Sequence, residues 1–290
     1  MKTKYYDPKT TKFPYADITD KHYLIVKKNR GVAFDKDYTY VDTSKWFLFK
    51  QKIIRSLLIF IVFPLMKIRL GLKIEGKENL IRNKELLKNG AISVSNHIHM
   101  WDYIAIMYAL RKHKTYTIVW DKNMNGENGP LIKLVGGIPF PEDNFTGGIV
   151  FIKAVEKLLL KSGWVHIYAE GSMWEYYTPI RPFKTGAAFF AYKTDRPILP
   201  MAFSYRKPNF IRRLFGQIAT LTLKIGSPMF INKNLSLKEK QIDLTKRVHE
   251  EVCRLAGINP DENIYNDVFN QDKRVDYYTT QYGSKYKGSK

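Results

Sequence analysis

Between residues 91 and 225 the chain alternates short apolar, β-branched stretches with longer amphipathic ones, and this pattern constrains the fold more than any other feature. The strand-like stretches are 91–95, 115–120, 136–140, 164–168, 198–203 and 220–225. Helix-like stretches lie between several of them, at 101–111, 147–162 and 185–192. Alternation of this kind is typical of a layered α/β domain. We therefore expect a mostly parallel sheet flanked by helices.

Towards the end of the chain, Ser236 and Glu239 have the spacing of a capping box, which predicts the start of a helix. That helix is amphipathic and ends before Gly257. A chain of 290 residues is long enough for one domain of about 200 residues with extensions. We divide it into an N-terminal extension whose role the sequence does not reveal, a helical segment, a central domain and a polar tail, at 1–50, 51–75, 76–256 and 257–290.

The helical segment contains an apolar run without charge, at 56–66. The run is shorter than the roughly 20 residues that a membrane-spanning helix needs, and Pro64 interrupts it. Basic residues flank it on both sides, at Lys50, Lys52, Arg55, Lys67, Arg69, Lys73 and Lys77. We expect a helix, or two helices bent at Pro64, lying among lipid headgroups. A buried core helix and a true span are the alternatives.

The formal charge of +21 predicts an anionic partner, and nucleic acid, an anionic leaflet or an acidic carrier protein would each suit it. No recognised nucleic-acid-binding motif supports the first. The single cysteine, Cys253, excludes an internal disulfide and a cysteine-based metal finger, and its place on the last predicted helix indicates a packing role. Residues 1–20 lack the apolar core of a signal peptide, so we expect no export.

The first group of chemically active residues lies where a predicted strand gives way to a helix, in the segment 95–102 (SNHIHMWD). Open α/β sheets usually bind their ligands at such places. His97 can act as a general base near neutral pH, and Asp102 can fix its tautomer and stabilise its cation. Five positions on a continuous helix turn two side chains about 140° apart. The pair can meet only if His97 lies in a loop and Asp102 in the first helical turn.

Two other interpretations of this segment stay open at this point. His97, His99 and Asp102 could bind a metal ion, but zinc would need a further ligand, and none with helical spacing lies nearby. Alternatively, the histidines are structural. We expect no metal site.

A second group follows the predicted strand 164–168, where Glu170, Gly171 and Ser172 form a turn. Next comes a basic loop with Arg181 and Lys184 that leads into a helix of small residues at Gly186. Backbone amides at the start of that helix, together with the two cations, predict a phosphate site.

In their order, these segments resemble the glycerolipid acyltransferase family, which contains the lysophosphatidic acid acyltransferases. That family carries Asn-His-x-x-x-x-Asp, a glycine-containing block, Pro-Glu-Gly-Thr-Arg, Phe-Lys-x-Gly and a Pro-x-x-Pro strand. The matching stretches here are 96–102, 136–140, 169–172, 183–186 and 197–200. The resemblance covers about 80–225, and five blocks in the right order carry it, although each block alone is a weak signal.

The resemblance implies a single-domain α/β enzyme with a membrane-contacting N-terminal helical segment. His97 would deprotonate an acceptor hydroxyl, which attacks an acyl thioester directly, and Asp102 would orient the imidazole. Residues 170–172 would shape the acceptor site, and Lys184, with Arg181 and Gly186, would hold its phosphate. The acyl donor would be acyl-CoA or acyl carrier protein, with no bound cofactor. The expected location is the cytoplasmic face of the cell membrane, as a peripheral or monotopic protein.

Three departures from the family pattern bear on the acceptor. Ala169 replaces the usual proline, Met173 replaces the arginine that contacts the acceptor phosphate, and the block around Gly137 lacks its arginine. Each charged hydrogen bond to phosphate would contribute about 1.5–3 kcal/mol. The expected acceptor is 1-acyl-glycerol-3-phosphate, giving phosphatidic acid, with another lysolipid, a glycolipid or an aminolipid as the alternative. A non-catalytic lipid-binding protein of the same fold and a basic nucleic-acid-binding protein are more distant alternatives.

Overall fold

The computed structural model describes residues 20–23, 26, 29–215, 217 and 219–263. Most of the predicted polar tail and the first part of the predicted N-terminal extension therefore lie outside the described residues. Their division from the rest of the chain stays a prediction.

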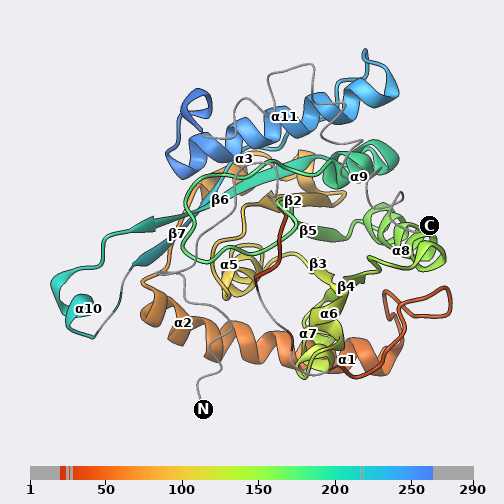
Figure 1. Ribbon diagram of the computed structural model, residues 1–290, viewed down its shortest axis with the longest axis horizontal. Coiled ribbons are helices and arrows are strands. Elements are labelled where there is room, and N and C mark those ends of the chain that lie inside the picture. The colour runs from red at the N-terminus through yellow and green to blue at the C-terminus, as the bar shows by residue number, and fades with distance from the viewer. Residues whose placement is uncertain (1–19, 24–25, 27–28, 216, 218, 264–290) are drawn as a thin grey trace, which may run out of the picture.

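A seven-stranded sheet forms the centre of the molecule, with the strand order β1-β7-β6-β2-β5-β3-β4 (Figure 1). The strands are β1 (Lys73–Glu75), β2 (Ala91–Ser95), β3 (Thr115–Trp120), β4 (Gly137–Phe140), β5 (Trp164–Tyr168), β6 (Ile198–Arg206) and β7 (Thr220–Ile225). All neighbouring pairs are parallel except β6 and β7. The predicted mostly parallel α/β sheet is confirmed.

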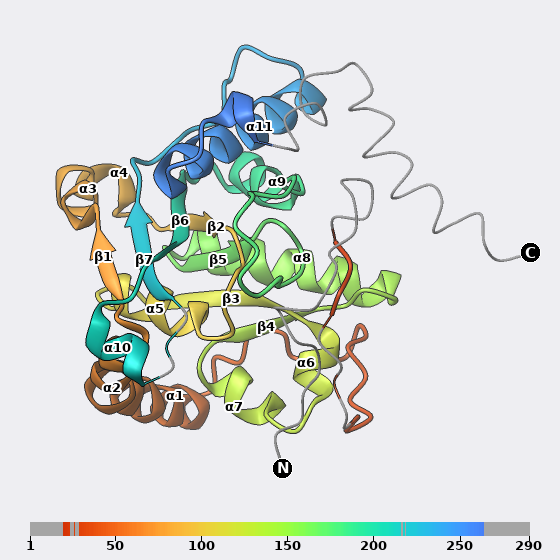
Figure 2. The same ribbon diagram turned by 60° about the vertical axis from the view of Figure 1, so that its left-hand side comes forward.

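Helices pack on both faces of this sheet (Figure 2). One face is covered by α8 (Phe145–Leu160), α9 (Gly186–Thr194) and α11 (Leu237–Ala256), and the other by α5 (Asp102–Ala109) and the helical segment around α2 (Phe63–Leu70). Successive residues of a strand point to opposite faces. In β6, for example, Ala202 packs in the core beneath α8, α9 and α11, and Met201 packs in the core beneath α5 and α2. The resulting two apolar layers hold the carboxyl ends of the central strands in fixed positions.

Most of the predicted helical segment, 51–75, lies in one long helical rod made of α1 (Lys45–Leu57), η2 (Leu58–Val62) and α2, which begins earlier and ends before β1. It runs along one side of the molecule (Figure 1). Its middle part, η2, is a π-helical turn in which the N–H of Phe63 bonds to the carbonyl of Leu58. Pro64 follows directly, has no N–H and crowds the carbonyl four residues earlier, so one looser turn lets the helix continue past it.

This rod is not a buried core helix, because it buries only one face. Phe63, Met66 and Leu70 pack into the core. On the outer side, large apolar residues remain exposed, among them Phe60 (77% exposed) and Ile68 (70% exposed). None of the helices in the described part of the chain is long and apolar enough to cross a membrane.

The other elements are short and lie mainly in connections. They are α3 (Lys77–Arg82), α4 (Lys84–Leu87), α6 (Asp121–Asn125), α7 (Gly129–Leu134), α10 (Phe210–Leu214) and η3 (Pro260–Glu262). Sequence patterns did not predict them, since each is too short to show a helical period. The last long helix, α11, begins with the predicted capping box of Ser236 and Glu239 and ends at Gly257 in a left-handed conformation.

Candidate active site

The bend between β2 and α5 is fixed at its start by Asn96. The side-chain amide of Asn96 donates to the carbonyl of Phe203 at 2.9 Å and accepts from the N–H of the same residue at 2.7 Å. Asn96 is fully buried, so both polar ends of its amide need partners inside the protein. This two-point contact joins the end of β2 to the neighbouring strand β6 and sets the direction in which the chain leaves the sheet.

His97 and Asp102 meet across this bend. The distance from His97 Nδ1 to Asp102 Oδ2 is 3.1 Å, which is within hydrogen-bonding reach. His97 lies in the loop and Asp102 is the first residue of α5. The chain therefore folds back between these two residues, which is the condition under which their side chains can meet. Because a carboxylate can only accept, the imidazole proton lies on Nδ1, which leaves the lone pair of Nε2 on the other edge of the ring.

Asp102 is held through one of its carboxyl oxygens. Its Oδ2 also accepts from the backbone N–H groups of Ile98 at 2.9 Å and His99 at 3.0 Å. The carboxyl group is completely buried, and burial raises its pKa to about 7, although the two backbone hydrogen bonds oppose that rise. These donors fix one orientation of the carboxyl group, and with it the orientation of the imidazole.

The imidazole of His97 is clamped between its carboxyl partner and an aromatic ring. It stacks on Tyr168 at the end of β5, with ring centroids 3.8 Å apart and 12° between the planes. Its side chain keeps 22% of its surface exposed, so a substrate can reach it. Burial lowers the pKa of His97 to about 3, which keeps the ring neutral at pH 7. A neutral, oriented imidazole with one open edge can accept a proton from a hydroxyl.

Glu170 ties the histidine loop to the rest of the site. Its Oε2 accepts from the backbone N–H of His97 at 2.9 Å and from Nη2 of Arg181 at 2.7 Å. Its Oε1 accepts from the backbone N–H of Arg181 at 2.9 Å. Only 1% of each residue is exposed, so this is a buried ion pair with its remaining lone pairs used. Glu170 therefore positions the backbone of His97.

Arg181 is a structural cation in this arrangement. Its guanidinium donates to Oγ of Ser172 at 2.7 Å and lies 4.3 Å from the ring centre of Trp174. Since the group is buried and bonded to Glu170 and Ser172, its placement does not support the predicted contact with an acceptor phosphate. It instead fastens the turn after β5 to the loop that precedes α9.

Lys184 is the cation of this region that reaches the surface, with 41% of its side chain exposed. Its stem lies over Gly171, whose φ is +83°, and a Cβ there would lie 2.8 Å from Cε of Lys184. The lysine Nζ is 3.1 Å from Oδ2 of Asp20. Gly171 thus provides both the left-handed turn and the space that Lys184 needs. Gly186, at the start of α9, is exposed beside this loop.

The structure shows the surroundings of His99 and Met173, which the sequence did not specify. Nδ1 of His99 accepts from the N–H of Trp101 at 3.1 Å, and Nε2 lies 3.7 Å from Glu175. Among the described residues, no group of three or more His, Cys, Asp or Glu side chains is arranged to hold a metal ion. Met173 is buried at the position where the resembling family has a phosphate-binding arginine.

Three side chains near the catalytic pair were not predicted from the sequence. Tyr168 stacks on His97, His166 bonds to two serines of β2, and the hydroxyl of Tyr205 donates to the carbonyl of Ile98 at 2.6 Å. A signal for two of them was present. His166 and Tyr168 lie two positions apart on β5, so both side chains point to the same face of the sheet. The parallel register places Tyr168 beside Ser95. Tyr205 had none, because the predicted strand ended two residues before it.

Residues 71–204 match the model of the acyltransferase family. The matched segment runs from the end of α2 into β6 and contains His97, Asp102, Glu170 and Lys184. No curated protein gives a significant match. Among solved structures, the chain is similar to the 1-acyl-sn-glycerophosphate (LPA) acyltransferase PlsC from Thermotoga maritima. The two are 20% identical with a TM-score of 0.49, over 74% of this chain and 82% of that one.

Proposed function

Residues 71–204 belong to the acyltransferase family, and on that premise we propose that the protein moves a fatty acyl group from a thioester to the hydroxyl of a lysophospholipid. The observation that carries the proposal is the 3.1 Å contact between His97 and Asp102, with the imidazole partly open to solvent. The proposed donor is acyl-CoA or acyl carrier protein, and no bound cofactor takes part. The proposed product is phosphatidic acid for phospholipid biosynthesis.

In the proposed reaction, Nε2 of His97 removes the proton from the acceptor hydroxyl as its oxygen attacks the thioester carbonyl carbon. A carbon–oxygen bond forms and a tetrahedral intermediate results. When the intermediate collapses, the carbon–sulfur bond breaks and the departing thiolate takes up the proton from His97. General-base assistance of this kind is typically worth on the order of 10²–10⁴ in rate.

Asp102 supports the proton transfer in two ways. Its contact with Nδ1 keeps the lone pair on Nε2, and its carboxylate stabilises the imidazolium that forms during the attack. Glu170 acts one step further away, since it holds the backbone of His97 and touches no reacting atom in this scheme.

For the acceptor we propose 1-acyl-glycerol-3-phosphate, with its phosphate near Lys184 and the start of α9. A partly exposed lysine beside a helix N-terminus suits an anion. The alternative is an acceptor without a phosphomonoester, such as a glycolipid or aminolipid. The presence of methionine at position 173 favours this alternative, because the family's phosphate-binding arginine is missing there.

We also propose that the enzyme works at the cytoplasmic face of the cell membrane as a peripheral or monotopic protein. The exposed apolar side of α1, η2 and α2 supports this, since exposed apolar patches of this extent mark interaction sites. A lysophospholipid would then meet the catalytic pair from the leaflet in which it already resides.

The test is an assay of the purified full chain with a labelled acyl-CoA or acyl carrier protein and a panel of lysolipids. We expect transfer to at least one lysophospholipid, and replacement of His97 by alanine should abolish turnover while the protein stays folded. The matched control is His113→Ala, because His113 is also partly buried and stacks on an aromatic ring, Trp164. Near-normal turnover by the His97 variant would refute the mechanism.

A further inference from the structure

A second exposed apolar element lies beside the helical rod. The short helix α10 and the residue directly after it, in the connection between β6 and β7, expose four large apolar side chains, Phe210, Ile211, Leu214 and Phe215, at 62–87%. On the rod, the exposed apolar side chains are Trp46, Phe49, Ile53, Leu57, Phe60, Ile61, Leu65 and Ile68. Soluble proteins rarely expose so many large apolar side chains close together unless the surface binds something.

The connection that carries α10 is fastened to the end of the rod. Gln217 donates to the carbonyl of Arg69 at 2.9 Å, and Nη2 of Arg206 donates to the carbonyl of Gly71 at 2.6 Å. These carbonyls belong to the last turn of α2, where the helix dipole is negative and cations are favoured. Figures 1 and 2 both show α10 next to α2. The two apolar elements therefore keep a fixed relative position.

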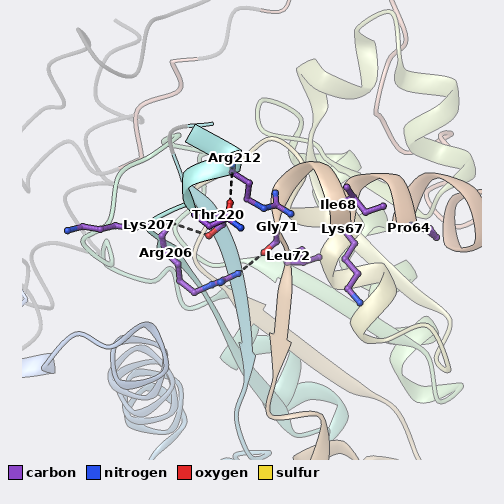
Figure 3. A pocket seen from close by; sticks show the side chains of 10 residues that line it. Pro64, Lys67, Ile68, Gly71, Leu72, Arg206, Lys207, Arg212 and Thr220 are labelled. Carbon is purple, nitrogen blue, oxygen red and sulfur yellow. Dashed lines mark hydrogen bonds between the residues drawn. The ribbon is translucent and has the colours of Figure 1, made fainter. Parts of the chain in front are cut away.

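Between the rod and this connection lies an open pocket of about 640 Å³. Figure 3 shows the residues that line it, which are Pro64, Lys67, Ile68, Gly71, Leu72, Arg206, Lys207, Asn209, Arg212 and Thr220. Four of them are basic and none is acidic. Lys67 and Lys207 are exposed and have no ion-pair partner within the described part of the chain. The pocket is therefore cationic, with an apolar rim from Pro64 and Ile68.

The pocket opens near the same edge of the sheet as the catalytic pair. β2 and β6 are parallel, so Ser95 and Arg206 both mark carboxyl ends at that edge. Tyr205, the residue before Arg206, donates its hydroxyl proton to the carbonyl of Ile98, next to His97. A ligand in the pocket would thus lie on the side from which a lipid substrate has to arrive.

We propose that this pocket binds the phosphate headgroup of an anionic phospholipid in the leaflet, while α10 and the rod insert their apolar side chains around it. The proposed association of the rod with a membrane is the basis of this assignment, and α10 and the pocket add to it a second anchor and a headgroup site. Lysine and arginine side chains next to apolar ones are the pattern that binds anionic leaflets. A second copy of the chain fits less well, because a symmetric contact would bring the same cations together.

The headgroup site is tested by flotation of the full chain with vesicles of phosphatidylcholine, with and without phosphatidylglycerol. The variant is Lys67→Gln with Lys207→Gln. Two control pairs remove the same charge, Lys153→Gln with Lys157→Gln on α8, and Lys50→Gln with Lys52→Gln on α1. We expect the pocket pair to weaken binding to anionic vesicles on the order of tenfold. The α8 pair should change binding to anionic vesicles less than twofold. The α1 pair should weaken this binding more than the α8 pair and less than the pocket pair.

The apolar anchor is tested with Leu214→Ser combined with Phe215→Ser. Its matched control is Phe145→Ser with Leu160→Ser, which replaces the same residue types at exposed positions of α8. Figures 1 and 2 place α8 across the molecule from α10. We expect the α10 pair to lower binding to both kinds of vesicle at least fivefold, and the α8 pair to leave it unchanged.

Several results would overturn the proposal. Equal losses for the pocket pair and the α1 pair would mean that diffuse charge attracts the leaflet without a headgroup site. Binding of the pocket pair to anionic vesicles at wild-type strength would show that the pocket holds no headgroup. A change of mass in sedimentation for the α10 pair, with vesicle binding intact, would assign α10 to contacts between copies. Acyl transfer is not measured in any arm, so failure here leaves the proposed reaction to its own test.

Discussion

The backbone N–H of His97 donates to Oε2 of Glu170 across 2.9 Å, so the residue proposed as general base is held through its main chain by a buried carboxylate. The same carboxylate pairs with Arg181, which lies beyond the turn that follows β5. One charged group therefore joins the two segments that the sequence singles out.

Replacing Glu170 by glutamine should lower both stability and turnover. The change leaves the guanidinium of Arg181 buried without its counter-charge, and breaking a buried pair in this way typically costs about 3–5 kcal/mol. Urea unfolding should show this loss, and kcat should fall more than KM changes. The control is Glu175→Gln, which also lies near the site and has a longer contact, 3.7 Å, with His99. Equal effects of the two substitutions would contradict a positioning role for Glu170.

Replacing Asp102 by asparagine should lower kcat by roughly 10²–10⁴ with little change in KM. The amide can present its N–H to Nδ1, which would favour the tautomer with the proton on Nε2 and remove the base. Asp121→Asn is the control, because burial also raises the pKa of Asp121 and it lies outside the catalytic bend. Steady-state kinetics with the best acceptor would decide, and an unchanged kcat would rule out the assigned tautomer.

Stability should depend on pH through His166, which burial keeps neutral by lowering its pKa to about 3. In the unfolded chain the pKa is the ordinary 6.5, so the unfolded state binds more protons below that pH. The stabilising contribution is therefore complete above pH 6.5 and is lost as the pH falls towards 3. At pH 5 the loss is about 2 kcal/mol.

The measurement for this prediction is urea unfolding of the wild type and of His166→Gln at pH 7 and pH 5. Other titrating groups occur in both proteins and cancel in the difference. We expect the wild type to lose about 2 kcal/mol more than the variant between the two pH values. A difference independent of pH would show that His166 does not titrate as assigned.

Replacing Gly171 by alanine should destabilise the protein by roughly 1–3 kcal/mol. Its φ of +83° is unfavourable for alanine, and the new Cβ would lie 2.8–2.9 Å from the end of the Lys184 side chain. Gly148→Ala is the control, since Gly148 lies within α8 with open space around its Cβ position. Thermal unfolding should show a lower Tm for the first variant and an unchanged or higher Tm for the second. Equal Tm values would contradict the strained turn.

The fold was largely predictable because strands and long helices leave a periodic trace in the sequence. The stretches 91–95 and 164–168 are strands with the predicted bounds. The antiparallel direction of β7 relative to β6 was not predictable, since a buried strand has the same apolar pattern in either direction. The connection between β6 and β7 carries α10 and reverses the direction of the chain. Its sequence has no periodic pattern, so neither the antiparallel pair nor α10 was predicted.

The site was predictable where the residues are close in sequence. His97 and Asp102 lie five positions apart, and the requirement that they meet fixed where the loop had to end and the helix had to begin. The buried contacts of Arg181 were not predictable in this way. Its charge and its place before α9 suggested a phosphate ligand, but the path of the turn after β5 gives it the buried partners Glu170 and Ser172, and no local pattern specifies that path.

The amide bridge between Asn96 and Phe203 has a consequence for the order of events during synthesis. The two residues are 107 positions apart, so the bend that carries the imidazole lacks this support while the ribosome is still making the earlier strands. A nascent chain cannot complete its active centre until β6 has emerged. Premature termination between residues 187 and 202 would thus yield a polypeptide that contains every proposed catalytic residue but does not have the bridge that sets their geometry.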